Sequence, residues 1–184
     1  MNHELTPRRY HTGFTLIELL VSLIILLVGL LGMAGLQTRT QHAEMESYQR
    51  SQALILIQDI VDRLNANREV ADCYVIASIG TGYTGTPACT AGSLEQLSTA
   101  NADLTAWNSM LLGASETSGG TNTGAMICAR GCITSLGTNQ YLVTVVWQGV
   151  TPTAAPAQEC GQGLYGDDNL RRAISIPVTI GDLI

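Results

Sequence analysis

A long apolar run near the N-terminus most limits what this chain can fold into. Residues 14–36 read FTLIELLVSLIILLVGLLGMAGL, and Glu18 is the only charged residue among these 23. As a helix the run is about 35 Å long, which is enough to cross the hydrocarbon core of a bilayer. Arg8 and Arg9 precede it, and this charge bias favours a cytoplasmic N-terminus. We therefore expect one membrane-spanning helix.

An ordinary secretory signal peptide would also combine a basic start with an apolar core. This run is longer than a usual signal core and lacks a clear small-x-small cleavage site. It also contains Glu18, and an unpaired carboxylate at that depth in a bilayer is costly. A cut between Gly13 and Phe14 would create an ammonium group one helical turn from Glu18. The same ammonium on a neighbouring copy could pair with Glu18 from a second molecule.

The string GFTLIELLVSLIILLVGLLG resembles the signature of type IV prepilins and type II secretion pseudopilins. That signature is a short basic leader ending in glycine, then Phe, Thr, Leu, Ile, Glu and an apolar helix. The resemblance implies that a prepilin peptidase/N-methyltransferase removes residues 1–13 after Gly13 and methylates Phe14. Glu18 would then set the registry of subunits during assembly. The mature chain would have 171 residues (184 − 13).

The helical pattern continues beyond the apolar run, and no proline occurs between Phe14 and Glu69. We predict one helix over about 14–67. Its half at 14–36 would lie in the membrane or the filament core, and its amphipathic half at 37–68 would pack on a domain. The apolar positions near helical spacing are Met45, Tyr48, Ala53, Leu56, Ile57, Ile60, Val61 and Leu64. The residues expected on the solvated side are Arg39, Arg50, Asp59 and Asp62.

Three glycines, Gly29, Gly32 and Gly35, interrupt the side-chain pattern of this helix. Each costs a helix about 1 kcal/mol relative to alanine. They could allow close packing against another helix, as small residues do in membranes, or mark a stretch that can unwind. Major pilins that resemble this chain have proline at the position equivalent to Gly35, where their helix melts in the filament. This sequence departs from that pattern, so both interpretations stay open.

Residues 69–184 are predicted to form a globular domain. The segment SLEQLSTANADLTAWNSMLLG indicates a helix or helix pair, with Ser93 placed to cap its start and Gly113 to end it. ASETSGGTNTG (114–124) indicates a flexible polar loop. AMICARGCIT and QYLVTVVWQG flank the turn segment SLGTN, which predicts a hairpin. Apolar residues alternate in RRAISIPVTI, where Pro177 indicates an edge strand.

The expected fold class is therefore α+β, with a long N-terminal helix packed on a small antiparallel β-sheet domain. The pilin resemblance implies the same architecture.

Five cysteines lie beyond the apolar run: Cys73, Cys89, Cys128, Cys132 and Cys160. On the predicted periplasmic side of the membrane disulfides persist. We prefer Cys73–Cys89 and Cys132–Cys160 with Cys128 left unpaired, and Cys128–Cys160 remains the alternative. Cys128 and Cys132 are four apart, as in some zinc sites, but the histidines stand at 3, 11 and 42, outside this region.

Composition excludes several kinds of chemistry. The net charge is −6 and the chain has no lysine, so it lacks the basic face that nucleic acid requires. The domain has no histidine to serve as a base for Ser or Cys. Its Gly-rich loop, IGTGYTGTPACTAG, has no phosphate-binding pattern. Asp167 and Asp168 beside Arg171 and Arg172 are predicted to form a surface ion cluster, with a weak calcium alternative at GDDN. We expect no cofactor, no metal and no enzymatic activity.

The segments CITSLGTNQYLVTVVWQG and ECGQGLYGDDNLRR resemble the end of PilV-type minor pilins. This resemblance implies a single-pass inner-membrane protein that moves from the periplasm to the pilus tip, priming assembly and supporting twitching motility and adhesion. Its implied partners are other minor pilins, the major pilin, a PilY-type tip adhesin and the inner-membrane assembly platform. One alternative is a minor pseudopilin of type II secretion. Another is a membrane-anchored binding module such as a competence DNA receptor, which the acidic domain argues against.

Overall fold

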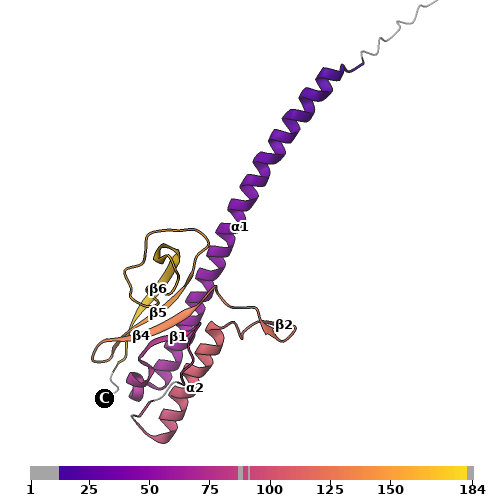
Figure 1. The fold of residues 1–184 in the computed structure, drawn as a ribbon. Coiled ribbons are helices and arrows are strands. Elements are labelled where there is room, and N and C mark those ends of the chain that lie inside the picture. The colour runs from indigo at the N-terminus through magenta and orange to yellow at the C-terminus, as the bar shows by residue number, and fades with distance from the viewer. Residues whose placement is uncertain (1–12, 87–88, 91, 182–184) are drawn as a thin grey trace, which may run out of the picture. The chain divides into compact units, whose positions relative to one another are not determined.

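A computed structural model describes residues 13–86, 89–90 and 92–181 (Figure 1). The leader prediction rests mostly on residues 1–12, which lie outside the described residues. The chain divides into two units, Met1–Ala43 and Glu44–Ile184, and each is described by itself.

The first unit contains the beginning of helix α1, which runs from Leu16 to Ala66. The helix starts two residues after the predicted start and ends one residue before the predicted end. Its side chains are exposed all the way round throughout the first unit, and an 18-residue window in it is apolar enough to cross a membrane. The helix is unbroken at Gly29, Gly32 and Gly35, and a methyl group added at any of these would meet nothing within 4 Å.

In the second unit α1 buries one stripe of side chains against the domain. The buried residues are Gln49, Ala53, Leu56, Ile57, Ile60 and Leu64. Met45 and Tyr48 were expected in this stripe, but each is 48% exposed. Counting back from Ala53 in steps of three or four residues, the stripe passes through Gln49 and Glu46 instead, which puts Met45 and Tyr48 on the flank of the helix.

A four-stranded antiparallel sheet in the order β1-β4-β5-β6 packs against α1. Its strands are β1 (Ile76–Gly80), β4 (Arg130–Gly137), β5 (Gln140–Gln148) and β6 (Arg171–Thr179). The hairpin prediction is confirmed, because β4 and β5 pair with Ile133 opposite Val143. The edge prediction for Pro177 is also confirmed, because β6 pairs with β5 alone.

No strand was predicted between the long helix and the second helix, and the structure has one there, β1. A 3-10 helix, η1 (Arg68–Tyr74), follows α1, and β1 then pairs with β4 at the edge of the sheet. The expected flexible loop at 114–124 contains a small hairpin of two-residue strands, β2 (Thr117–Ser118) and β3 (Thr121–Asn122). Its paired glycines, Gly119 and Gly120, have φ of 59° and 82° and supply the turn.

Helix α2 (Leu94–Leu111) is a single helix with the predicted ends. Ser93 and Gln96 form a reciprocal capping box at its start, and Gly113 follows its end at φ 84°. Trp107 of α2 is fully buried and joins the helices to the sheet. Its indole N–H donates to the Leu56 carbonyl at 2.9 Å. Its ring covers Gly131 of β4, where an added Cβ would lie 2.3 Å from a ring carbon.

Candidate assembly segment and the networks that hold the domain

The predicted processing and assembly residues lie at the exposed start of α1. Phe14, Glu18, Leu19 and Ser22 line one hollow on this surface, and Phe14 is 84% exposed. The Glu18 backbone N–H donates to the Thr15 hydroxyl at 3.4 Å. None of the ion pairs among the described residues includes Glu18. In an apolar setting such a carboxylate requires a cationic partner.

Two disulfides crosslink the domain, and they are the two pairs that the sequence analysis preferred. Cys73 in η1 is bonded to Cys89, with 5.1 Å between their Cα atoms. Cys132 in β4 is bonded to Cys160, with a Cα separation of 6.0 Å. Both separations are ordinary for disulfides. Cys128 is a partly exposed free thiol. Because Cys132 and Cys160 are bonded to each other, this structure has neither the alternative Cys128–Cys160 bridge nor a Cys128/Cys132 zinc pair.

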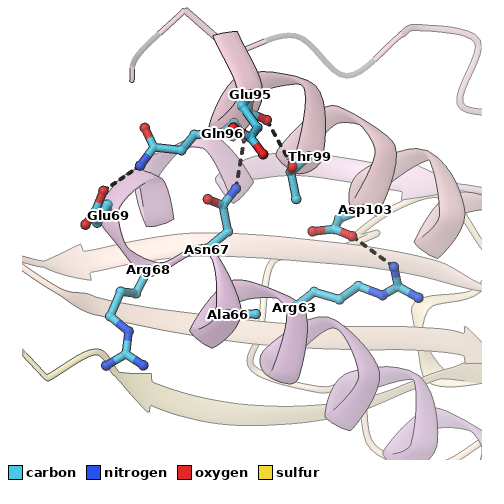
Figure 2. Close-up of a pocket in the computed structure, with 9 residues that line it drawn as sticks. All are labelled: Arg63, Ala66, Asn67, Arg68, Glu69, Glu95, Gln96, Thr99 and Asp103. Atoms are coloured by element: carbon cyan, nitrogen blue, oxygen red, sulfur yellow. Dashed lines mark hydrogen bonds and ion pairs between the residues drawn. The ribbon is translucent and has the colours of Figure 1, made fainter. Parts of the chain in front are cut away.

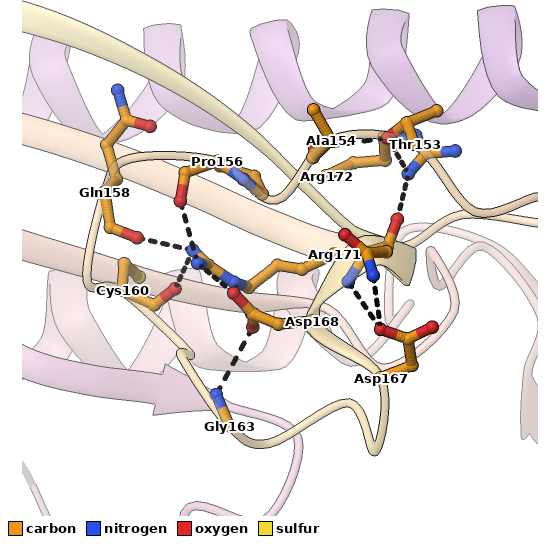
Figure 3. A network of polar contacts seen from close by, with 11 residues as sticks. Thr153, Ala154, Pro156, Gln158, Cys160, Gly163, Asp167, Asp168, Arg171 and Arg172 are labelled. Carbon is orange, nitrogen blue, oxygen red and sulfur yellow. Dashed lines mark hydrogen bonds and ion pairs between the residues drawn. The ribbon is translucent and has the colours of Figure 1, made fainter.

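The prediction of a surface ion cluster was wrong for Arg171, which is only 1% exposed. Figure 3 shows the polar groups that surround its guanidinium. Its guanidinium donates to both carboxylate oxygens of Asp168, at 2.8 and 2.7 Å. It also donates to the backbone carbonyls of Pro156, Gln158 and Cys160. The hydrogen bonds between the two side chains raise the pKa of Arg171 and lower that of Asp168. Arg171 thus fixes the path of the loop between β5 and β6.

Asp167 caps the short helix η2 (Asp168–Leu170) by accepting from the Asn169 backbone N–H. The carboxylates of the GDDN segment are therefore engaged within the protein. No group of three or more His, Cys, Asp or Glu among the described residues is arranged to hold a metal ion.

Arg172, the residue after Arg171, links the loop between β5 and β6 to α1. It donates to Glu46 at 3.2 Å and to the Thr153 hydroxyl at 2.8 Å. Glu46 also accepts from the Val150 backbone N–H at 2.9 Å. Gly149 lies where these groups meet, and a Cβ there would lie 2.6 Å from the Arg172 guanidinium carbon and displace the ends of the two side chains.

A third network joins the end of α1 to α2 beside an open pocket (Figure 2). Arg63 donates to Asp59 at 2.8 Å and to Asp103 at 2.9 Å, and Tyr74 donates to Asp103 at 2.6 Å. The hydrogen bonds to the two carboxylates raise the pKa of Arg63, and burial is the main cause of the raised pKa of Tyr74. Asp59 was expected on the solvated side, and it is instead partly buried by this pairing.

Of these contacts, only the charged pairing near Asp168 and Arg171 was expected from the sequence, as a surface cluster. The contacts of Arg172 with Glu46 and of Arg63 with Asp103 were not. Arg63 and Asp103 are 40 positions apart, and Arg172 and Glu46 are 126 apart, so no short motif connects either pair. One signal was present: residues 69–184 contain only three arginines, and two of them, Arg171 and Arg172, are adjacent. The networks contain no nucleophile paired with a base. Their chemistry is that of holding loops and helices in place.

An exposed apolar helix that continues into a small disulfide-linked antiparallel domain is consistent with the type IV pilin fold. Residues 8–34 match the family model for the prokaryotic N-terminal methylation motif, and residues 35–105 match the model for type IV pilin Tt1218. Comparison with curated proteins gave no significant match, and comparison with solved structures gave none either. The chain belongs to the type IV pilins and their prepilins.

Membership has direct consequences for how the chain is handled in the cell. The methylation motif implies processing by a prepilin peptidase and assembly into pili with other pilins. The signal and the apolar helix fit membrane anchoring followed by a place in a pilus. Pilins are in general structural proteins rather than enzymes.

Proposed function

We propose that this chain is a PilV-type minor pilin that helps to prime assembly of the type IV pilus and forms part of its tip complex. In that role it supports twitching motility and adhesion. Residues 1–13 are its leader, 14–36 the membrane and filament-core segment, 37–68 the amphipathic half of the helix, and 69–184 the periplasmic domain. Its partners are other minor pilins, the major pilin, a PilY-type tip adhesin and the inner-membrane assembly platform. It binds no nucleic acid and no cofactor.

One observation carries the proposal: on an apolar, exposed helix that starts beside Phe14, the Glu18 carboxylate has no counterion among the described residues. Cleavage after Gly13 leaves a cationic, N-methylated amine on Phe14. A bilayer makes an unpaired carboxylate costly, so the Glu18 of one subunit gains most by pairing with the amine of another. The pairing sets the registry of helices as subunits leave the membrane.

The intact mass of the protein recovered from membranes tests the processing step. We expect a chain of 171 residues (184 − 13) that begins with Phe14 and carries one methyl group on its amine. A mature chain that began elsewhere would refute Gly13 and Phe14 as the processing residues.

A Glu18→Ala variant tests the registry role. We expect normal cleavage but at least about tenfold less protein in sheared pili, because a lost pairing in the bilayer is worth a few kcal/mol. Glu44→Ala is the matched control, since Glu44 is an exposed glutamate on the same helix. Normal incorporation of the Glu18 variant would contradict the registry argument.

A clean deletion strain separates the pilus from the type II secretion alternative. Surface pili and secreted exoproteins are measured side by side in the deletion strain and in a complemented strain. We expect pili to be lost with secretion intact. Loss of secretion with normal pili would instead assign the chain to the pseudopilus.

A further inference from the structure

Trp147 of β5 is buried and lacks a hydrogen-bond acceptor. The residue is 3% exposed, and its indole N–H has no partner among the described residues. Trp107, the other tryptophan, is buried with its hydrogen bond made, because its indole N–H donates to the Leu56 backbone carbonyl at 2.9 Å. A buried donor without an acceptor is costly and uncommon in folded proteins. The hydrogen-bonding capacity of the Trp147 indole N–H is therefore unused among the described residues.

Trp147 lines a cavity of about 420 Å³ between α1 and the start of β6. Glu46, Ser47 and Arg50 line it from α1, and Arg172, Ala173 and Ile174 line it from β6. All of these residues belong to the second unit of the chain. Ser47 and Arg50 are exposed, so the cavity opens to solvent on the helix side.

The charges of the cavity favour an anion. Arg172 is held by Glu46, Thr153 and the carbonyls of Thr151 and Asn169, so its charge is largely compensated by protein groups. Arg50 takes part in none of the ion pairs among the described residues. One negative and two positive side chains leave the cavity with an excess of one positive charge.

We propose that this cavity is a carboxylate-binding site, in which Arg50 pairs with the carboxylate and the Trp147 indole N–H donates to one of its oxygens. A carboxylate fits because its two oxygens can accept from both donors at once. The source we infer is an Asp or Glu side chain of an adjacent subunit, and this part rests on the proposed function. Arg50 would then be the exposed end of the contact and Trp147 its buried end.

Nuclear magnetic resonance of the full oxidised chain in detergent micelles tests the site, with sodium acetate as the probe. The chain has two tryptophans, so two indole N–H signals are expected, and Trp107 is an internal control. The Trp147 signal should move downfield and saturate with acetate, but not with sodium chloride at equal ionic strength. Arg50→Gln should weaken acetate binding by about tenfold, as expected for a lost charged hydrogen bond.

Arg68→Gln is the matched control, because Arg68 is an exposed arginine of the same unit that does not line the cavity. Equal shifts of both indole signals would overturn the site. So would a Trp147 signal that is insensitive to acetate, as expected if the Gln49 amide, whose oxygen is also buried without a partner, turned to accept from it.

The source of the carboxylate is tested in cells with a photo-crosslinking residue at Ser47, which lines the mouth of the cavity. An adduct to an acidic segment of another pilin, found in sheared pili, would support the adjacent-subunit source. Acetate binding without any such adduct in pili would overturn that source. A chain that binds acetate but never enters pili would refute the proposed function and leave the site standing. A chain that enters pili but does not bind acetate would refute the site alone.

Discussion

The two halves of α1 differ in what surrounds their side chains, although they form one continuous helix. Before Glu44 every described side chain is exposed, and nearly all of residues 14–36 are apolar. After Glu44 one stripe from Gln49 to Leu64 is buried, and charged residues occupy the other faces. The first half therefore takes its stability from a bilayer or from neighbouring helices, whereas the second half takes it from its own domain.

A substitution should therefore change the free energy of unfolding of the domain only if it lies in the second half of α1 or in the domain itself. Both tryptophans lie in the domain, so their fluorescence during denaturant unfolding reports on that unit alone. For each variant, this fluorescence is measured on the full oxidised chain in detergent micelles.

The largest expected effect is that of Arg171→Met. The variant leaves Asp168 and the carbonyls of Pro156, Gln158 and Cys160 without their donor, because one guanidinium serves all of them. Asp168 is partly exposed, so the cost comes mainly from the three carbonyls, and leaving buried acceptors unsatisfied costs about 1–3 kcal/mol each, or at least about 3 kcal/mol together. We expect the free energy of unfolding to fall by that amount. Arg68→Met is the control, since Arg68 is exposed, and it should change the value by less than about 0.5 kcal/mol.

A matched pair of isoleucines tests the comparison directly. Ile57 is 0% exposed in the second half of α1, and Ile24 is 58% exposed in the first half. Ile57→Ala should lower the free energy of unfolding of the domain by about 2–4 kcal/mol, through lost burial and the cavity left behind. Ile24→Ala should leave it unchanged. If the two variants had equal effects, the two halves of the helix would not differ as the structure indicates.

Alanine substitutions at two glycines should have smaller effects, one destabilising the domain and the other stabilising the helix in which it lies. A Cβ at Gly131 would overlap the Trp107 ring at 2.3 Å, whereas a Cβ at Gly32 would meet nothing within 4 Å. Gly131→Ala should cost the domain about 1–3 kcal/mol, because the core is overpacked. Gly32→Ala should leave domain unfolding unchanged and stabilise its own helix by about 1 kcal/mol. Slower hydrogen exchange of the amides around Gly32, by about fivefold, would show the gain, and faster exchange would contradict it.

The elements that could be predicted from the sequence are those with a strong local signal. The apolar run and the absence of proline predict α1, and Ser93 with Gly113 predicts α2. Alternating apolar residues predict β5 and β6. β1 has no such pattern, because its sequence IASIG contains only two large apolar residues and lies at the edge of the sheet, where pairing with β4 decides its structure.

The functional and structural polar residues also differ in how well the sequence predicts them. Phe14 and Glu18 belong to a contiguous motif, so the sequence alone pointed to them. The environment of Arg171 could not be predicted, because DDNLRR is typical of a solvated turn and the carbonyls that bury Arg171 come from an irregular loop 11–15 residues away. Similarly, Arg172 meets Glu46 across 126 positions. Such contacts depend on the finished fold, so residue spacing cannot reveal them.

The smallest effect concerns Tyr141, a residue of the buried face of β5. Burial, together with a hydrogen bond to Asp72 at 2.7 Å, raises the pKa of Tyr141 from its ordinary 10 to about 12. Above pH 10 the unfolded chain releases this proton before the folded chain does, so the free energy of unfolding falls as the pH rises towards 12. The loss at pH 11 should be about 1 kcal/mol.

The Tyr141→Phe variant separates this titration from that of the other buried phenols, Tyr74 and Tyr165, whose pKa values are also raised by burial. Between pH 10 and 12 its stability should fall less steeply than that of the parent, by the equivalent of one proton. Tyr48→Phe is the control, because Tyr48 is 48% exposed on the flank of α1 and should leave the slope unchanged. An unchanged slope for Tyr141→Phe would mean that its phenol ionises equally easily in the folded and unfolded chains. The domain would then not shield β5 from solvent. This result would contradict the contrast between a buried domain and an exposed first half of α1.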